Sequence, residues 1–208
     1  LAGPSEVVVV ADESADPEWV AADLLAQAEH DPMARSLLAS PSGSLIDRVE
    51  ERLALLLAAL PRRDIAVKSL EAGGALILTA SIEEAIEVSN RLAPEHLELQ
   101  VSEPFRLLPL VTHAGAVFLG RHTPGVVGDY TAGPNHVLPT GGTARFSSVL
   151  GVEDFVKRSS VVHYSPKGLD EALPHLLALA RAEGLHGHGA AAEVRMRMRN
   201  AEWGMQHE

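Results

Sequence analysis

Apolar positions follow two different rhythms along this chain. Short runs of mostly apolar residues predict β-strands, and longer stretches with apolar residues every three or four positions predict helices. The run at residues 6–11 contains four consecutive valines, which indicates a strand buried on both faces, as in a parallel sheet. The predicted strands are residues 6–11, 35–39, 76–79, 97–101, 114–119 and 159–164.

Helix boundaries between these strands are marked by capping residues and prolines. Asp16 followed by Pro17 favours a helix start, and Ser81 with Glu84 forms a capping box at the start of another helix. The predicted helices are residues 17 to about 31, 44–60, 81–92, 104–112, 166–182 and 189–199, with a helical turn at 152–156. Because strands and helices alternate to about residue 144, the sequence predicts an α/β domain with a largely parallel sheet.

The stretch from residue 125 to 142 is the most distinctive part of the sequence. It contains five glycines and two prolines, which argue against a helix or a regular strand. Several apolar residues anchor it, so we expect an ordered functional loop that presents Asp129, Asn135 and His136. The alternative is an Ω-loop in which the aspartate and the histidine have only structural partners.

Two further groups of polar residues are candidates for chemistry. Asp23, Gln27 and His30 fall on one face of a predicted helix, which is either solvated or holds an ion. Glu95 and His96 are adjacent at a helix-to-strand junction. Such a pair is suited to general acid/base catalysis, although a Glu-His dipeptide also occurs incidentally.

Composition narrows the possible classes of function. The 208 residues include no cysteine, which excludes disulfides, thiolate metal sites and a cysteine nucleophile. The formal net charge of −11 argues against a nucleic-acid partner. No apolar run reaches transmembrane length and no signal peptide opens the chain, so we expect a cytoplasmic protein without a membrane partner. The chain starts with Leu1, and we expect it to be the carboxyl-terminal portion of a longer protein.

Five segments, taken together, are more specific than any one motif. They are Ala-Gly-Pro-Ser-Glu (2–6), Gln-Ala-Glu-His-Asp (27–31), Leu-Ala-Pro-Glu-His-Leu (92–97), Gly-Asp-Tyr-Thr-Ala-Gly-Pro-Asn-His (128–136) and Glu-Gly-Leu-His-Gly-His (183–188). In this order they resemble histidinol dehydrogenase. The resemblance covers essentially the whole chain, but only about the carboxyl-terminal half of that enzyme. It implies an incomplete Rossmann-like domain at residues 1–145 that holds zinc and substrate, and a small, mostly helical region at 146–208 that crosses to the partner subunit.

The resemblance also implies a reaction and a set of site residues. Histidinol dehydrogenases are homodimers with one zinc ion per subunit. They oxidise L-histidinol to L-histidine in two NAD-dependent steps through a bound aldehyde, at the end of histidine biosynthesis. The implied catalytic pair is Glu95 and His96. The implied zinc ligands are Gln27, His30, Asp129 and His188, and the implied substrate contacts are these four with Ser5, His96, His136 and Glu183.

The implied cofactor site lies outside this chain. In the family the nucleotide contacts belong to the amino-terminal half, so the resemblance assigns no NAD contact here, and we expect the 208-residue chain alone to be inactive. Three other interpretations are a zinc-dependent hydrolase with Glu95 activating water, a non-catalytic ligand-binding relative, and a plain structural α/β domain.

Overall fold

The computed structural model describes the backbone of residues 3–205 and the side chains of residues 3–195. The chain forms two compact units, Leu1–Val156 and Lys157–Glu208. The first unit contains a five-stranded sheet. Its strands are β1 (Glu6–Ala11), β2 (Arg35–Ser40), β3 (Gly74–Leu78), β4 (His96–Gln100) and β5 (Ala116–Leu119).

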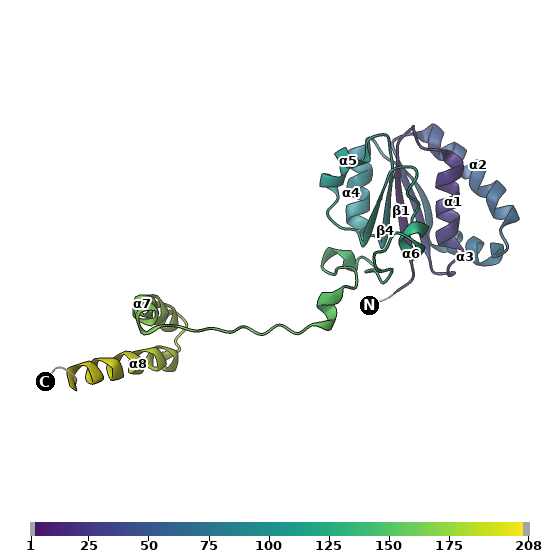
Figure 1. The fold of residues 1–208 in the computed structure, drawn as a ribbon. Helices are drawn as coiled ribbons and strands as arrows, with labels where there is room; N and C mark the ends of the chain where they lie inside the picture. Colours follow the sequence, from purple (N-terminus) through teal and green to yellow (C-terminus); the bar gives the residue numbers. More distant parts are fainter. Residues whose placement is uncertain (1–2, 206–208) are drawn as a thin grey trace. The chain divides into compact units, whose positions relative to one another are not determined.

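All neighbouring strands of this sheet are parallel, in the order β3-β2-β1-β4-β5. The predicted α/β fold with a parallel sheet is therefore confirmed. The order runs outward from β1 in both directions, so β1 and β4 are central neighbours that lie far apart in sequence (Figure 1). This is the arrangement of a Rossmann-like sheet.

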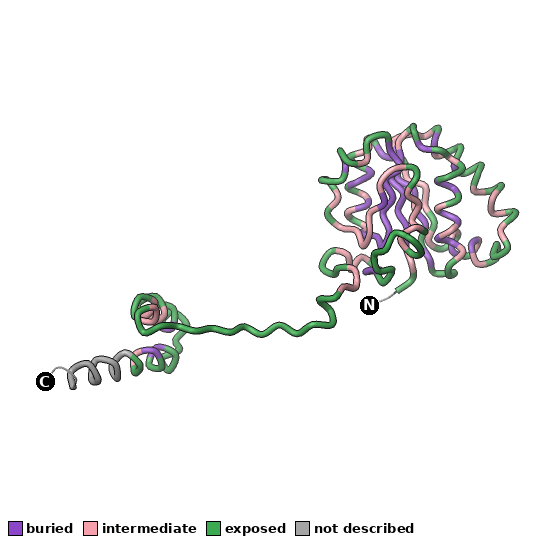
Figure 2. Tube along the Cα trace, in the orientation of Figure 1, coloured by how far each residue is buried: buried purple, intermediate pink, exposed green. Residues whose placement is uncertain are grey.

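Helices cover both faces of the sheet (Figure 1). One face carries α1 (Pro17–Ala28), α2 (Gly43–Ala59) and α3 (Arg63–Gly73), and the other carries α4 (Ile82–Leu92) and α5 (Pro104–Leu107), which continues into η1 (Leu108–Leu110). Burial follows this layering, with the buried residues of the first unit gathered in the central strands and on the helix faces that pack against them (Figure 2).

Strand β1 divides its valines between two cores. Val7 and Val9 pack with α1 and α2, whereas Val8 and Val10 pack on the α4 side. Burying such side chains is the main favourable contribution to folding, at about 1.5–3 kcal/mol for each. These contacts explain why the valine-rich run forms a strand with no solvent-exposed face.

Strand β4 uses the same alternation differently. Leu97 and Leu99 join the core on the α4 side. The strand pairs Val7 with His96 and Val9 with Glu98, so these two polar side chains lie on the α1 face. Because β4 is entirely buried, this face of the sheet carries buried polar groups where an apolar core is the rule.

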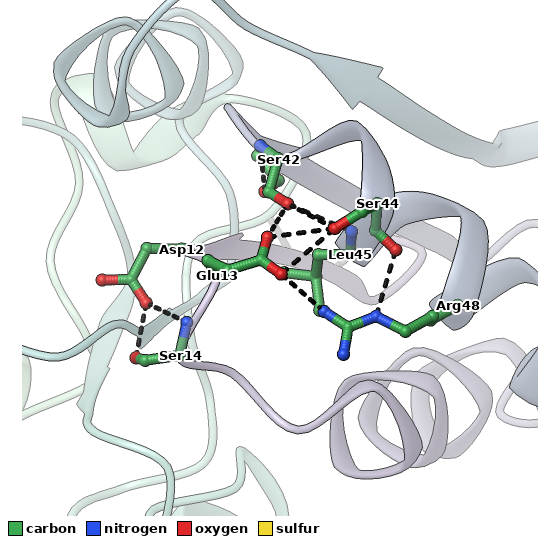
Figure 3. A network of polar contacts seen from close by, with 8 residues as sticks. Asp12, Glu13, Ser14, Ser42, Ser44, Leu45 and Arg48 are labelled. Carbon is green, nitrogen blue, oxygen red and sulfur yellow. Dashed lines mark hydrogen bonds and ion pairs between the residues drawn. The ribbon is translucent and has the colours of Figure 1, made fainter.

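Hydrogen bonds join the loop after β1 to the start of α2 (Figure 3). Ser42 is the N-cap residue of α2, and its hydroxyl accepts a hydrogen bond from the Leu45 N–H at 3.1 Å. The same hydroxyl donates to the Glu13 carboxylate, which also accepts from Ser44 and from Arg48 at 2.9 Å. The cap of α2 is thereby tied to the end of β1.

Asp12 joins the carboxyl ends of β1 and β4. One of its oxygens accepts hydrogen bonds from the N–H and the hydroxyl of Ser102, both at 2.9 Å, and the other accepts from Ser14. Burial alone would raise the pKa of Asp12, but these hydrogen bonds outweigh it and lower that pKa. The residue lies at the point where strand order reverses, which is the usual ligand position in open α/β sheets.

Three sequence predictions about elements were wrong or incomplete. A short helix, α6 (Val126–Tyr130), forms within the stretch where no helix was expected; it has five residues, starts after Gly125 and contains Gly128. Helix α3 was missed. Residues 159–164 form no strand, and Val161 and Val162 are exposed, since no strand of the described chain pairs with them.

The second unit is a pair of helices, α7 (Pro166–Ala182) and α8 (His186–Met205). Helix α7 continues through Pro174, and Gly184 follows it with φ +71°, as is typical just past a helix end. The unit begins after Val156 rather than at the predicted boundary of 145, because residues before it still bond to the first unit. One such bond joins the Leu150 N–H to the Val137 carbonyl at 3.0 Å.

The remaining elements are two short 3-10 helices, η2 (Thr143–Arg145) and η3 (Val152–Phe155). Within the described part of the chain, no helix has the length and apolar character needed to cross a membrane.

Candidate functional site

A pocket opens at the amino-terminal edge of the sheet, where β1 and β4 begin. Helix α1 runs antiparallel to the strands, so its carboxyl end reaches this edge, and α6 lies opposite. The pocket is lined by Val7, Asp23, Ala26, Gln27, His30, His96, Glu98, Gly125, Val126 and Asp129. The structure therefore brings four of the sequence-predicted site residues to one cavity: Gln27, His30, His96 and Asp129.

His96 is the first residue of β4 and is buried. Its Nδ1 lies 3.1 Å from the Glu6 carbonyl oxygen, which can only accept a hydrogen bond, so Nδ1 carries the proton in the neutral ring. Nε2 is then left as an acceptor, and it lies 4.0 Å from Asp129 Oδ1. The ring packs on Phe118, with centroids 5.8 Å apart. His96 is thus held in the tautomer that a general base requires.

Glu95 precedes His96 and is also buried. Its Oε2 accepts a hydrogen bond from the Glu6 N–H at 3.0 Å, and the Ser5 hydroxyl donates to the same carboxyl group. Burial raises the pKa of Glu95, although the neighbouring His96 and these hydrogen bonds act in the opposite direction. Oε2 is 3.6 Å from His96 Nδ1. The Glu-His dipeptide therefore forms one buried acid/base unit, of which His96 lines the pocket.

Gln27 and His30 reach the pocket from the carboxyl end of α1. Gln27 is 8% exposed, and its Nε2 atom has no hydrogen-bond partner. An unpartnered buried amide costs free energy of about 1–3 kcal/mol, so this group is an unusual feature of the pocket wall. His30 lies just beyond the helix end and is exposed. The two side chains differ in solvent access but line the same cavity.

Asp129 approaches from the opposite side on α6. The helix lies close to β5 because Gly128 has no side chain: a Cβ there would be 2.8 Å from the Phe118 ring. Phe118 in turn contacts His96. The local sequence Gly128-Asp129 thus serves two purposes, a close approach to the sheet and the delivery of a carboxylate to the pocket.

Two acidic pocket residues, Asp23 and Glu98, received no role in the predicted site, although Asp23 was noted on the helix face of Gln27 and His30. Glu98 is 2% exposed, and Gln100 Nε2 donates to both Glu98 Oε2 at 2.9 Å and Asp23 Oδ2 at 2.5 Å. Burial and, next, repulsion from Asp23 raise the pKa of Glu98 to about 8. The sequence contained features that point to Asp23 and Glu98. Asp23 shares a helix face with Gln27, and Glu98 occupies the polar phase of an alternating central strand.

Other predicted residues lie farther from this cavity or in the second unit. His136 lines a neighbouring pocket together with Asn135, His96 and Asp129. Glu183, the C-cap residue of α7, and His188 in α8 are exposed and belong to the second unit, so their roles stay predictions.

The donor set of the first pocket fits the predicted zinc site in part. His30, Asp129 and Gln27 supply an imidazole, a carboxylate and an amide, all of which zinc accepts as ligands. Gln27 would bind zinc through Oε1, whereas its unpartnered atom is the Nε2 donor, so the fit rests on the chemistry of the donor set. Among the described residues, no group of three or more His, Asp or Glu side chains lies close enough to hold a metal by itself. The predicted fourth ligand, His188, comes from the second unit.

Comparison with known proteins places this geometry in a family. A sequence model described as histidinol dehydrogenase matches residues 1–196. The chain is 53% identical over 196 residues to the histidinol dehydrogenase of Pseudomonas savastanoi pv. phaseolicola, covering 94% of this chain and 44% of that protein. It is 53% identical over 195 residues to that of Aquifex aeolicus, covering 94% and 46%.

A solved structure agrees with the sequence comparison. The crystal structure of histidinol dehydrogenase from Elizabethkingia anophelis superimposes with a TM-score of 0.90 at 39% identity, over 96% of this chain and 46% of that one. The chain thus spans a little under half the length of the relatives it matches. The family model matches residues 1–196, and the solved relative has the same fold. The chain therefore belongs to the histidinol dehydrogenase family.

Proposed function

We propose that this chain supplies the substrate- and zinc-binding part of an NAD-dependent histidinol dehydrogenase, which oxidises L-histidinol to L-histidine through a bound aldehyde. The observation that carries the proposal is the convergence of Gln27, His30, His96 and Asp129 on one pocket. Family membership favours this function over a zinc-dependent hydrolase, a non-catalytic binding protein or a purely structural domain.

In this proposal Gln27, His30, Asp129 and His188 hold the zinc ion. When bound, zinc supplies a positive charge that fixes the amino and imidazole nitrogens of the substrate. Ser5, His136 and Glu183 complete the substrate contacts. Glu183 and His188 come from the partner subunit of a homodimer, as the resemblance implies, and the enzyme acts in the cytoplasm.

His96 takes up protons in both oxidation steps. Its Nδ1–H is held by the Glu6 carbonyl, so Nε2 offers its lone pair to the substrate hydroxyl. As that proton moves to Nε2, the carbon-bound hydrogen leaves as hydride to the nicotinamide of NAD⁺, and the alcohol becomes an aldehyde. The buried Glu95 carboxylate, 3.6 Å from Nδ1, stabilises the imidazolium that forms.

Glu95 acts between the two oxidations. Because burial raises its pKa, it is a stronger base than an exposed carboxylate. It removes a proton from water, whose oxygen adds to the aldehyde carbon while the His96 imidazolium gives its proton to the aldehyde oxygen, so that the hydrate forms and His96 is neutral again. His96 then accepts a hydroxyl proton again while a second hydride leaves to a second NAD⁺, and the carboxylic acid is formed.

The proposed role of His96 is tested in a chimaera in which this chain replaces the matching part of the Aquifex aeolicus relative. Replacing His96 with asparagine preserves a hydrogen bond to Glu6 but removes the base. We expect NADH formation from histidinol to fall about 10²–10⁴-fold, the usual contribution of a general base. Near-normal turnover of the His96→Asn chimaera would remove His96 from this role.

The 208-residue chain alone is expected to form no NADH from histidinol, because the family resemblance assigns the nucleotide contacts to the other half. The measurement is absorbance at the NADH band with purified chain, zinc, NAD⁺ and histidinol. The intact chimaera serves as the positive control. Measurable NADH from the chain alone contradicts this expectation.

A further inference from the structure

Two carboxyl groups that line the pocket, the half-buried Asp23 and the buried Glu98, have no part in the chemistry proposed above. Glu98 is 2% exposed on β4, and Asp23 reaches it from α1. Both accept hydrogen bonds from the Gln100 amide nitrogen, at 2.9 and 2.5 Å. Among the described side chains, no Lys or Arg forms an ion pair with either carboxyl group.

Burial raises the pKa of both carboxyl groups, and repulsion from Asp23 raises that of Glu98 further. A hydrogen bond joins them, and the mutual repulsion of two buried carboxylates disfavours ionisation of both. The Gln100 amide nitrogen donates to both carboxyl groups, while its buried Oε1 has no hydrogen-bond partner. Shared hydrogen bonds therefore fix the orientation of Asp23 and Glu98.

The second oxygen of Glu98 bonds to a residue on the opposite wall of the pocket. Its Oε1 accepts a hydrogen bond from the Gly125 N–H at 2.8 Å. Gly125 immediately precedes α6, a five-residue helix without a side-chain cap hydrogen bond. So short a helix is not stable by itself and takes its position from its contacts.

Helix α6 is held at two points that bracket its first turn. One is the hydrogen bond from Gly125 to Glu98, and the other is the packing of Gly128 on the Phe118 ring. Asp129 directly follows Gly128. If the hydrogen bond between Gly125 and Glu98 is lost, the start of α6 is no longer fixed to β4. The orientation of the Asp129 carboxylate is then no longer fixed either.

We propose that Glu98 is a positioning residue for Asp129, holding the start of α6 against β4 while Asp23 and Gln100 fix its own orientation. The inference rests on the proposed function, in which Asp129 is a metal ligand. It extends that function by assigning the geometry of the ligand to a buried residue that touches neither metal nor substrate.

The test measures Zn²⁺ binding to the 208-residue chain by competition with a chromophoric chelator. We expect Glu98→Leu, which cannot accept the hydrogen bond, to weaken Zn²⁺ binding about 10–100-fold, as is usual for partners of metal ligands. Glu98→Gln retains an acceptor for Gly125 and is expected to bind Zn²⁺ close to the level of the unsubstituted chain. A matched control is Val49→Ala, which lowers stability in the core beside α2 without touching the pocket.

A second variant removes the same hydrogen bond from the other side. Gly125 has φ −52°, within the range of proline, so Gly125→Pro removes the N–H donor, and its ring also crowds Glu98, since a Cβ at Gly125 lies 3.0 Å from Glu98 Oε1. We expect a loss of Zn²⁺ affinity at least as large as in Glu98→Leu, and the melting temperature measures whether the fold itself is affected. This variant keeps the test decisive if Glu98→Leu does not fold.

The outcomes separate the two proposals. If Asp129→Asn abolishes Zn²⁺ binding while Glu98→Leu and Gly125→Pro leave it unchanged, Asp129 is a ligand and the positioning role of Glu98 is wrong. If Asp129→Asn leaves binding unchanged, the proposed ligand set is wrong, and the positioning role is overturned with it. Weakened binding in Glu98→Leu and Gly125→Pro, with recovery in Glu98→Gln, supports both.

Discussion

At the scale of single residues, Glu98 makes the stability of the fold depend on pH. Its pKa is about 8 in the folded chain and 4.5 in the unfolded chain. The folded state therefore holds a proton that the unfolded state releases, and the stabilisation is fully present below pH 4.5 and lost as pH rises through about 8. The titratable groups that share the pocket with Glu98 are Asp23, His30, His96 and Asp129.

The prediction is that the Glu98→Gln chain loses less stability between pH 5 and pH 8 than the unsubstituted chain. The amide stays neutral, so this proton no longer contributes to the difference. Urea unfolding at a series of pH values measures the effect. Parallel pH profiles for the two chains would show that Glu98 does not hold a proton in the folded state.

Gly128 gives a second prediction at this scale. An alanine there would place a methyl group 2.8 Å from the Phe118 ring, so α6 must move away from the sheet and take Asp129 with it. We expect Gly128→Ala to weaken Zn²⁺ binding about tenfold or more. Gly43→Ala is the matched control, because its new methyl group meets no atom within 4 Å. Equal Zn²⁺ affinities in the two variants would contradict this account of the packing.

Single residues also show the limits of sequence reasoning. The spacing of Gln27 and His30 placed them on one helix face, and both line the pocket. Glu98 was not assigned to the site because the alternating sequence of β4 indicates only that one of the two faces of the strand is polar. Which side that face lies on depends on the pairing of β4 with β1, about 90 residues earlier in the chain.

At the scale of elements, local signals predicted most of the first unit. Apolar runs identified the five strands, and caps such as Asp16 and Ser81 marked helix starts. Local signals failed where the outcome depends on a distant partner. Residues 159–164 have the composition of a strand, but a strand forms only beside another one, and α6 exists because Phe118 and Glu98 lie against it.

Ser42 carries a prediction for α2. Its hydroxyl caps the helix by accepting from the Leu45 N–H and also donates to Glu13. We expect Ser42→Ala to lower the free energy of unfolding by about 1 kcal/mol, with a range of roughly 0.5–2 kcal/mol for such caps. Ser44→Ala, which removes a partner of Glu13 but no cap, should cost less. Equal losses in urea unfolding would show that the cap itself contributes little.

At the scale of the whole molecule, the proposed zinc site needs parts of both units. If the second unit crosses to a partner subunit, a chain with His30→Ala and a chain with His188→Ala each lack a ligand, but a mixed dimer contains one complete site. We expect a refolded mixture of the two to regain Zn²⁺ binding at one of the two sites in each mixed dimer. A mixture that binds no more Zn²⁺ than its components would show that the second unit does not cross.

The bond from Asp12 to Ser102 has a consequence for nucleotide recognition. Doubly wound sheets commonly bind a pyrophosphate beyond the carboxyl ends of their central strands. Free backbone N–H groups and the N-terminus of a helix attract its negative charge there. Here the Asp12 carboxylate already accepts the hydrogen bond from the Ser102 N–H at this position. Its negative charge would also repel a phosphate. The Asp12 carboxylate therefore disfavours binding of a pyrophosphate at the carboxyl ends of β1 and β4.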